Sequence, residues 1–498
     1  MSSLTYPSAW SNARPSRPLR WTLLTTGLLV FAALAGRAAE PRVIKVQPPE
    51  TAASFDGWGT SLCWFANAIG RWPDPPRNAI ADALFSPAGL GLTFVRYNIG
   101  GGEDPSHRHM PWFRQMEGFS PAVGEWNWAA DPGQRWMLTA ALRRGVNRVE
   151  AFSNAPPYWM TLSGCVSGAA DPNHDNLDPR HEVAFAEYLA AVVKKFHQEW
   201  DVRFATIDPM NEPFTDYWRA HGKQEGCHFE RASQARLIQR LRAALDVRGL
   251  QQVRISAADE TNYSRAIETW QAYDAATRER VAVINAHAYD TARRTELRDL
   301  ARQSGRPLVM SEVDGGGGNP HDHRAIGPAL ILAKQIIDDL RDLQPERWTF
   351  WQAVEDETGM KDANSNWGLI HADLLGETRA WEATKKFHAM AQFTRFIHPG
   401  ATWATLSDTA SVAMHDRTRS TLVVVACNTG RANEVVTFDV SPFGAVGSRV
   451  EVFRTSATED CAALGGTETA ADGLLAASLA AESITTFVVH LGAGTPRP

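Results

Sequence analysis

Hydrophobic and polar positions alternate along most of the chain in a repeating way. From Phe55 to about Phe396, short apolar runs of strand length are followed by longer segments whose apolar residues recur every three or four positions. This alternation is typical of repeated strand–helix units around a parallel sheet. The amphipathic segments that we expect to form outer helices are 181–199, 229–248, 327–341 and 380–395.

The apolar runs predict eight strands. Their expected ends are Leu62, Asn98, Asn154, Asn211, Asp259, Tyr289, Glu312 and Gln352. Eight strands with helices between them fit an α/β fold of the closed (β/α)8 TIM-barrel type. An open doubly wound sheet is the alternative, but no glycine-rich phosphate motif follows the first strand. The glycines at 315–318 lack the lysine and hydroxyl residue of a P-loop.

The pattern changes after Pro399. Strand-sized runs such as T-L-V-V-V-A-C-N and I-T-T-F-V-V-H-L are separated by turn-rich residues, and helix-period segments disappear. We therefore predict a barrel over residues 55–397 and a β-sandwich over 398–498. A short apolar run at Val43–Val46 predicts that residues 41–54 add an N-terminal strand to that sandwich.

The first 40 residues have the composition of a secretory signal peptide. Arg14, Arg17 and Arg20 precede an apolar run over 22–35 and then small residues. A membrane anchor is the alternative, but about 14 apolar residues are too few to span a bilayer. We therefore expect a secreted or periplasmic protein that does not stay in a membrane after cleavage.

The net charge of the chain indicates which kinds of partner it can bind. Removing residues 1–40 takes away four arginines and Glu40, so the formal net charge falls from −6 to −9. An acidic protein of this kind is a poor ligand for nucleic acid, and we expect no nucleic-acid partner.

All five cysteines lie in the expected mature part. In an exported protein four could pair, and the pairings that we consider are Cys165 with Cys227 and Cys427 with Cys461. Cys63 lies within the apolar run S-L-C-W-F, which indicates a buried free thiol. Because no CxxC spacing is present, we predict no zinc site.

A cluster of charged residues follows three glycines near position 100. It has the residue types of a metal site, but we interpret it as a polar loop that faces the substrate. Its members are Glu103, Asp104, His107, Arg108 and His109.

Two glutamates carry the candidate chemistry. Glu212, in D-P-M-N-E-P, and Glu312, in V-M-S-E-V-D-G, each end an apolar strand-like run and lie 100 positions apart. At roughly 30 residues per strand–helix unit, that separation is three units, which brings both carboxylates to the carboxyl rim of a barrel. Paired carboxylates are the machinery of a glycosidase, in which one donates a proton and the other attacks the anomeric carbon. Asp314 is a rival for the second role.

Polar side chains near the expected strand ends predict the surroundings of the pair. Asn211 is placed to bond a sugar hydroxyl. His287 and Tyr289 lie on one face of a strand, where the tyrosine hydroxyl could orient the nucleophile; a buried structural tyrosine is the alternative. Arg96 lies inside a strand, where an unpaired charge is costly, so we expect it beneath the site and bonded to a carboxylate.

Aromatic and amide residues near strand ends are candidates for sugar binding. Indole rings stack on the apolar faces of sugars, although core packing is an equally good explanation for any single tryptophan. The candidates are Trp58, Trp159, Trp351, Asn98 and Asn154, of which Trp159 and Trp351 are the strongest.

Five motifs together resemble glycoside hydrolase family 30. They are F-D-G-W-G-T-S-L-C-W-F-A, V-R-Y-N-I-G-G-G, S-N-A-P-P-Y-W-M-T, D-P-M-N-E-P and S-E-V-D-G, and the likeness runs from about residue 43 to 490. The resemblance implies a retaining barrel enzyme with Glu212 as acid/base and Glu312 as nucleophile. It also implies a side β-sandwich built from both chain ends.

Within that family the G-T-S-L-C-W-F-A and K-Q-E-G-C-H-F stretches look most like the β-1,6-galactanase branch. The resemblance implies a retaining hydrolase of β-1,6-linked galactan, and the loop from Lys223 to Phe229 would shape a subsite. Endo and exo action both remain open. Other specificities of the family, namely β-xylanase, β-glucosidase and β-fucosidase, are alternatives.

A non-catalytic carbohydrate-binding protein is the alternative from another class, and the presence of both glutamates disfavours it. We expect a monomer that acts on a polysaccharide or oligosaccharide, with no cofactor and no metal. For a retaining mechanism the two carboxyl groups should lie roughly 5–5.5 Å apart.

Overall fold

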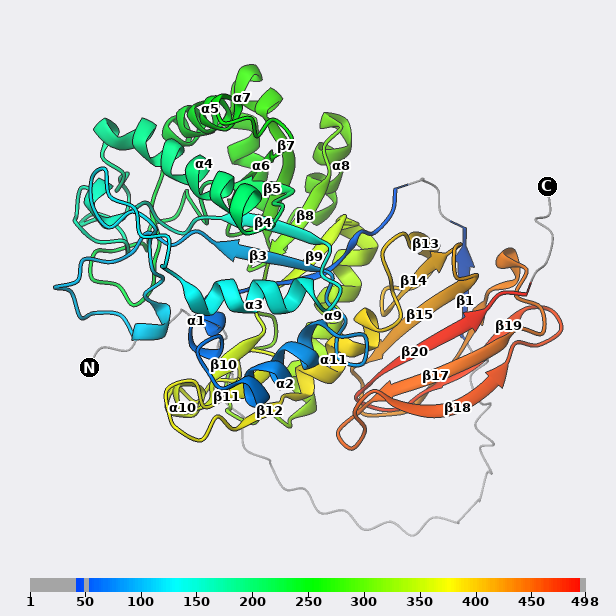
Figure 1. Ribbon diagram of the computed structural model, residues 1–498. Coiled ribbons are helices and arrows are strands. Elements are labelled where there is room, and N and C mark those ends of the chain that lie inside the picture. The colour runs from blue at the N-terminus through cyan, green and yellow to red at the C-terminus, as the bar shows by residue number, and fades with distance from the viewer. Residues whose placement is uncertain (1–41, 49–52, 493–498) are drawn as a thin grey trace, which may run out of the picture. The chain divides into compact units, whose positions relative to one another are not determined.

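The computed structural model describes residues 42–48 and 53–492. Eight parallel strands close into a barrel in chain order (Figure 1). They are β2 (Gly57–Ser61), β3 (Phe94–Asn98), β4 (Arg148–Phe152), β5 (Thr206–Asp208), β6 (Arg254–Glu260), β7 (Val281–His287), β8 (Leu308–Glu312) and β9 (Arg347–Gln352). The predicted TIM barrel is confirmed, and the predicted signal peptide, residues 1–40, lies outside the described residues.

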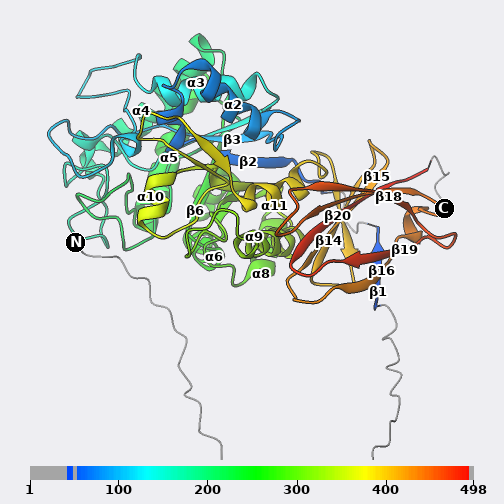
Figure 2. The same cartoon turned by 90° about the horizontal axis from the view of Figure 1, so that it is seen from below.

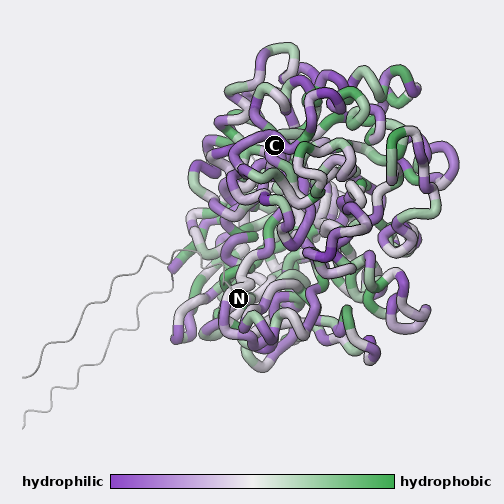
Figure 3. Tube along the Cα trace, turned by 90° about the vertical axis from the view of Figure 1, so that its left-hand side faces the viewer, coloured by the Kyte–Doolittle hydropathy of each residue, from purple (hydrophilic) through white to green (hydrophobic). Residues whose placement is uncertain are grey.

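The strands of the barrel are buried on both faces, and all five residues of β3 and of β8 are buried. Helices cover the outside, and hydrophobic and hydrophilic stretches alternate along the chain (Figure 3). The helices are α1 (Phe65–Ile69), α2 (Asp74–Phe85), α3 (Pro132–Leu142), α4 (Glu182–Glu199), α5 (Arg231–Val247), α6 (Tyr263–Ala272), α7 (Ala275–Arg280), α8 (Arg294–Ser304), α9 (Ile326–Asp338), α10 (Glu357–Asp362) and α11 (Lys385–Thr394).

The four helices predicted from periodicity are present, with one shifted start. The last was expected from residue 380 but begins at Lys385, because the preceding residues form a strand instead. That strand, β12 (Trp381–Ala383), pairs with β11 (Ile370–Ala372), which pairs with β10 (Val354–Asp356) in a small sheet that the sequence pattern did not predict.

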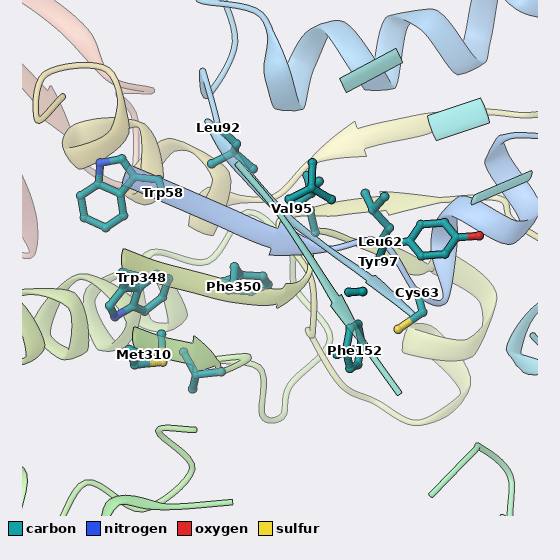
Figure 4. Close-up of a cluster of buried hydrophobic side chains, with 14 of the residues drawn as sticks. Trp58, Leu62, Cys63, Leu92, Val95, Tyr97, Phe152, Met310, Trp348 and Phe350 are labelled. Carbon is teal, nitrogen blue, oxygen red and sulfur yellow. The ribbon is translucent and has the colours of Figure 1, made fainter. Parts of the chain in front are cut away.

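Trp58 belongs to the core, and the prediction that it binds sugar is wrong. It is the second residue of β2, so it lies toward the amino end of the barrel, far from the carboxyl rim. Its indole is buried, donates a hydrogen bond to the carbonyl of Ile397 at 2.9 Å and packs 6.1 Å from the ring of Trp348. Figure 4 shows these two indoles near each other, away from Cys63 and Phe152.

The last part of the chain forms a β domain. Its strands are β13 (Thr402–Leu406), β14 (Ser411–Asp416), β15 (Thr421–Asn428), β16 (Glu434–Asp439), β17 (Arg449–Thr455), β18 (Ala462–Glu468), β19 (Leu474–Leu479) and β20 (Ser483–His490). The N-terminal strand β1 (Arg42–Gln47) pairs with β13 and with β16, as the apolar run at Val43–Val46 predicted.

This β domain folds over a second apolar core. Phe438 of β16 and Phe487 of β20 have ring centroids 5.8 Å apart, so strands from the two ends of the sheet order face each other as in a sandwich. The domain packs against α9 and α11 (Figures 1 and 2). Gln392 of α11 is part of that boundary, because it donates to the hydroxyl of Thr455 at 2.9 Å and accepts from Thr486.

The proposed disulfides are not formed. All five cysteines are free and buried, so both pairings considered from the sequence are wrong, and the buried thiol predicted at Cys63 is confirmed. Cys165 faces two histidine rings, and Cys227 donates to the carbonyl of His228, so neither sulfur points at the other. Across the described residues, none of the helices has the length and apolar character needed to cross a membrane.

Candidate active site

The two predicted glutamates reach the carboxyl rim by different routes. Glu312 is the last residue of β8 and is buried there. Glu212 lies four residues beyond the end of β5 and has φ = 46°, a left-handed conformation that is uncommon for a residue with a side chain. Its amide donates to the carbonyl of Asp259 at 3.0 Å, which holds the turn. Strained backbone of this kind clusters at functional sites.

His287, the last residue of β7, connects the pair. Its Nδ1 lies 3.2 Å from an oxygen of Glu212 and 3.5 Å from an oxygen of Glu312. One atom each of Glu212, His287 and Glu312 lie within 4.8 Å of one another. The carboxylates therefore share one small volume at the rim.

Glu312 is held by two further donors. Arg96 of β3 donates from Nη1 to Oε2 at 3.2 Å, and the hydroxyl of Tyr289 donates to Oε1 at 3.1 Å. The carboxylate is 3% exposed, so these contacts replace most of its water. The structure thus places both side chains, which the sequence had assigned as supporting residues, directly on Glu312.

Glu212 has a partner that the sequence did not reveal. The hydroxyl of Tyr217 donates to its Oε2 at 2.5 Å. Tyr217 and Tyr289 are each 45% exposed, whereas the two glutamates are nearly buried, so the tyrosines lie on the solvent side of the pair. Tyr217 lies in an irregular loop after Pro213. No strand or helix periodicity there predicts which way a side chain faces.

A buried ionic network lies beneath the pair. Arg96 bonds Glu150 of β4 at 3.1 Å, Asp259 of β6 and Glu312, and all of these groups are inaccessible to water or nearly so. The hydroxyl of Ser311 donates to Asp259 at 2.6 Å. One cation is therefore shared by three carboxylates, which fixes Glu312 from below.

We expect Arg96→Met to destabilise the protein by about 3–5 kcal/mol, because removal of one partner leaves buried carboxylates without compensation. Urea unfolding followed by fluorescence measures the change. Arg148→Met is the matched control. Arg148 pairs with Asp56 at 3.2 Å on the surface, and an ion pair of this kind contributes little to the free energy of unfolding. An Arg96→Met variant as stable as wild type would show that the network does not hold the barrel.

The carboxylates and the imidazole between them alter each other's titration. Burial raises the pKa of Glu312 to about 7, and the charge of Glu212 adds to the rise while His287 and Arg96 oppose it. Burial alone would lower the pKa of His287, but Glu312 and Asp259 outweigh it and raise that pKa well above its ordinary value. The charged form of His287 is therefore favoured beside the two glutamates.

Asp314, the rival carboxylate, points away from this volume. It accepts from the amide of Gly368 at 3.3 Å and lies 3.7 Å from the ammonium group of the buried Lys386. Burial raises the pKa of Asp314 to about 6, which the charge of Lys386 opposes. Its partners belong to the segment after β9, so Glu312 alone of these two faces Glu212.

Two of the predicted substrate contacts lie close to the glutamates. The side-chain oxygen of Asn211 is buried and has no hydrogen-bond partner among the described residues. Trp351 is half-buried at the end of β9, and its amide donates to the carbonyl of Val313, next to Glu312. Both have a free surface or atom to offer a ligand.

The other predicted contacts have structural partners. Trp159 is half-buried, and its indole donates to the carbonyl of Ser120 at 2.9 Å. The amide group of Asn98 donates to the buried Glu225 at 2.7 Å, and its oxygen accepts from the amide of Asn154. The two asparagines therefore connect neighbouring loops of the rim, and the structure gives no free atom on Asn98 for a sugar.

A close pair of carboxyl groups on the carboxyl rim of a (β/α)8 barrel defines a glycoside hydrolase. Comparison with known proteins agrees, since residues 41–292 match the family described as O-Glycosyl hydrolase family 30. The chain is 33% identical over 447 residues to an endo-beta-1,6-galactanase of Hypocrea rufa. This match covers 84% of this chain and 88% of that protein. This chain belongs to glycoside hydrolase family 30.

Two further likenesses are consistent with that membership. An exo-beta-1,6-galactobiohydrolase of Bifidobacterium longum is 25% identical; the match covers 88% of this chain and 38% of that longer protein. The catalytic domain of the GH30 xylanase C of Talaromyces cellulolyticus superposes with a TM-score of 0.66 at 21% identity, over 90% of this chain and 100% of that domain. At this identity the second likeness shows the fold alone.

Proposed function

We propose that the protein is a retaining β-glycoside hydrolase that cleaves β-1,6-linked galactan, such as the side chains of arabinogalactan. The approach of Glu212 and Glu312, with one oxygen of each within 4.8 Å, carries the mechanism. Inverting enzymes need carboxyl groups roughly 6.5–9.5 Å apart to admit water between them, so the short separation favours retention. The likeness to the Hypocrea rufa galactanase supports the choice of substrate.

In the first step, Glu212 in its protonated form delivers its proton to the glycosidic oxygen as that bond breaks. Ionised Glu312 attacks the anomeric carbon from the opposite face and forms a covalent glycosyl-enzyme. In the second step, Glu212, now ionised, removes a proton from water, and the water oxygen displaces Glu312. The sugar leaves with its original anomeric configuration, and both glutamates return to their starting forms.

The neighbouring side chains support these roles. Arg96 and Tyr289 hold Glu312 by donating to separate oxygens, which aims the carboxylate and stabilises its ionised form. Tyr217 fixes the orientation of Glu212. We further propose that the free oxygen of Asn211 accepts from a sugar hydroxyl and that Trp351 stacks on a sugar ring.

The substrate assignment is tested by incubating the mature protein with de-arabinosylated arabinogalactan and with β-1,6-galacto-oligosaccharides, followed by separation of the products by size. We expect galactose oligomers or a single short product, and the pattern distinguishes endo from exo action. A Glu312→Gln preparation serves as the blank for contaminating enzymes. Activity on xylan or β-glucosides with none on galactan would overturn the substrate and leave the glutamate pair in place.

We also propose that the protein is exported, with residues 1–40 removed as a signal peptide, and that it acts as a monomer. N-terminal sequencing of protein recovered from outside the cytoplasm, together with light scattering, tests both points. A retained N-terminus in a membrane fraction would contradict export with cleavage.

A further inference from the structure

Three loops at the carboxyl rim bring together four side chains that can bind a metal. His107 and His109 lie in the loop after β3, Cys165 in the loop after β4, and His221 in the loop after β5. One ligand atom from each lies within 4.8 Å of all the others. Sequence spacing did not reveal this group, because only the two histidines of the His-x-His pair are neighbours in the chain.

The geometry matches a tetrahedral site. The sulfur of Cys165 lies 3.5 Å from Nδ1 of His107 and 3.7 Å from Nδ1 of His221. Zinc–sulfur and zinc–nitrogen bonds of ordinary length at the tetrahedral angle put sulfur and nitrogen about 3.6 Å apart. The three imidazole centroids are 5.1–5.5 Å from one another, and three rings on one tetrahedral metal are separated by roughly 5 Å.

The hydrogen bonds of the group leave a lone pair without a donor. His109 contacts the carbonyl of Gly222 through Nδ1, which must donate there, so its Nε2 carries a lone pair in the neutral ring. That Nε2 is buried, lacks a hydrogen bond within the described part of the chain, and lies 3.2 Å from a carboxylate oxygen of Glu103. Two electron-rich atoms at this distance repel each other unless a positive charge, either a bound metal ion or a second proton on the ring, lies between or beside them.

The surrounding structure holds the ligands in place before any ion binds. Glu103 accepts from the amide of Val166 at 3.2 Å, and its carboxylate lies 3.0 Å from Nδ1 of His107, so it adds fixed negative charge beside the ligand nitrogens. The loops after β4 and β5 are bonded to each other, since the amide of Gly222 donates to the hydroxyl of Ser167 at 3.0 Å. His221 has φ = 60°, a strained conformation that brings its ring to the cysteine.

We propose that His107, His109, Cys165 and His221 form a structural zinc site that ties together the loops after β3, β4 and β5. A set of three imidazoles and one thiolate is a borderline-soft tetrahedral donor set that suits zinc. Because four protein ligands complete the tetrahedron, the ion has no open position for substrate and its role is structural. Our earlier expectation of a substrate-facing polar loop without zinc is replaced for His107 and His109.

The proposed ion would also support the active site at a distance. The loop after β5 carries Tyr217, which bonds the carboxylate of Glu212, and Trp218, whose indole donates to the carbonyl of Glu212 at 3.1 Å. His221 is three residues farther along that loop. Zinc at His221 therefore anchors the segment that orients the acid/base.

The test uses the full mature chain without a polyhistidine tag. We expect elemental analysis of protein purified without chelator to find zinc that dialysis does not remove. After replacement by Co²⁺, a thiolate-to-cobalt charge-transfer band should appear, together with the strong visible absorption of tetrahedral cobalt. Cys165→Ser should lose the charge-transfer band and at least tenfold in zinc affinity.

A second histidine group provides a matched control. His321, His323, Glu357 and His371 also approach within 4.8 Å of one another but contain no sulfur. His371→Gln should therefore leave the charge-transfer band unchanged, whatever that second group binds. His221→Gln, an exposed ligand, keeps the test available if Cys165→Ser does not fold, and it should weaken zinc binding.

A chelator supplies an independent readout. It should lower the Tm of wild type by more than it lowers the Tm of Cys165→Ser. The proposal is overturned if the wild-type protein binds neither zinc nor cobalt, or if the charge-transfer band persists in Cys165→Ser. None of these measurements depends on galactan being the substrate.

Discussion

Glu312→Gln is expected to abolish hydrolysis of galacto-oligosaccharides and of activated aryl β-galactosides alike. Without a carboxylate on β8 no glycosyl-enzyme forms, and a better leaving group does not replace the missing nucleophile. Loss of a nucleophile that works as part of a catalytic unit lowers kcat on the order of 10⁴-fold or more. Initial rates with both substrate types measure the effect.

Asp314→Asn is the matched control for this substitution. It changes a second carboxyl group two residues along the chain, where the partner is Lys386 instead of Glu212. We expect its activity to stay within about tenfold of wild type, because binding contacts away from the reacting carbon cost less than the nucleophile. If Asp314→Asn were inactive while Glu312→Gln kept its activity, Asp314 would be the nucleophile in place of Glu312. Near-ultraviolet circular dichroism verifies that both variants are folded.

Glu212→Gln should show an effect that depends on the leaving group. General acid catalysis contributes about 10²–10⁴-fold, so cleavage of galacto-oligosaccharides should fall by that factor. A dinitrophenyl galactoside needs no proton for departure, and its first step should be nearly unchanged. Azide should then accelerate turnover and give the β-galactosyl azide, because it attacks the glycosyl-enzyme without a general base. Equal loss on both substrates would contradict the acid/base assignment.

The pH dependence of the same variant has a defined sign. Wild-type kcat/KM should be bell-shaped: it falls at low pH when Glu312 gains a proton and at high pH when the general acid loses one. Burial raises the pKa of Glu312 and the charge of Glu212 raises it further. That charge is present only after the general acid has ionised; on the acid limb Glu212 is protonated and neutral, as Gln is, so with the dinitrophenyl substrate the acid limb of Glu212→Gln should stay close to that of wild type and the alkaline limb should disappear. An alkaline limb that persists in Glu212→Gln would contradict the assignment of Glu212 as the general acid.

The sequence predicted those parts of the site that depend on strand geometry. Glu312, His287 and Arg96 lie in or at the end of strands, where apolar runs mark the strand and its carboxyl end marks the rim. Arg96 was also predictable from energetics, because a charge inside a barrel strand needs partners.

The parts that were missed depend on loops or on the position within a strand. Tyr217 and His221 lie in an irregular segment whose path no periodicity specifies. Trp58 was misplaced because an apolar run shows that a strand exists but does not show how far its first residues lie from the rim. The cysteine pairings were wrong, and the metal ligands were missed, for one reason. Contacts between segments that are far apart in the chain produce no characteristic spacing of residues in the sequence.

The pairing of β1 also has a consequence for how the molecule is made. Arg42, in the first described strand, is in register with Val436, so partners almost four hundred residues apart must meet. Contacts of such sequence separation form late, because the chain between them must be ordered or closed as a loop first. Strand β1 therefore stays without these partners until the segments that form β13 and β16 have been synthesised.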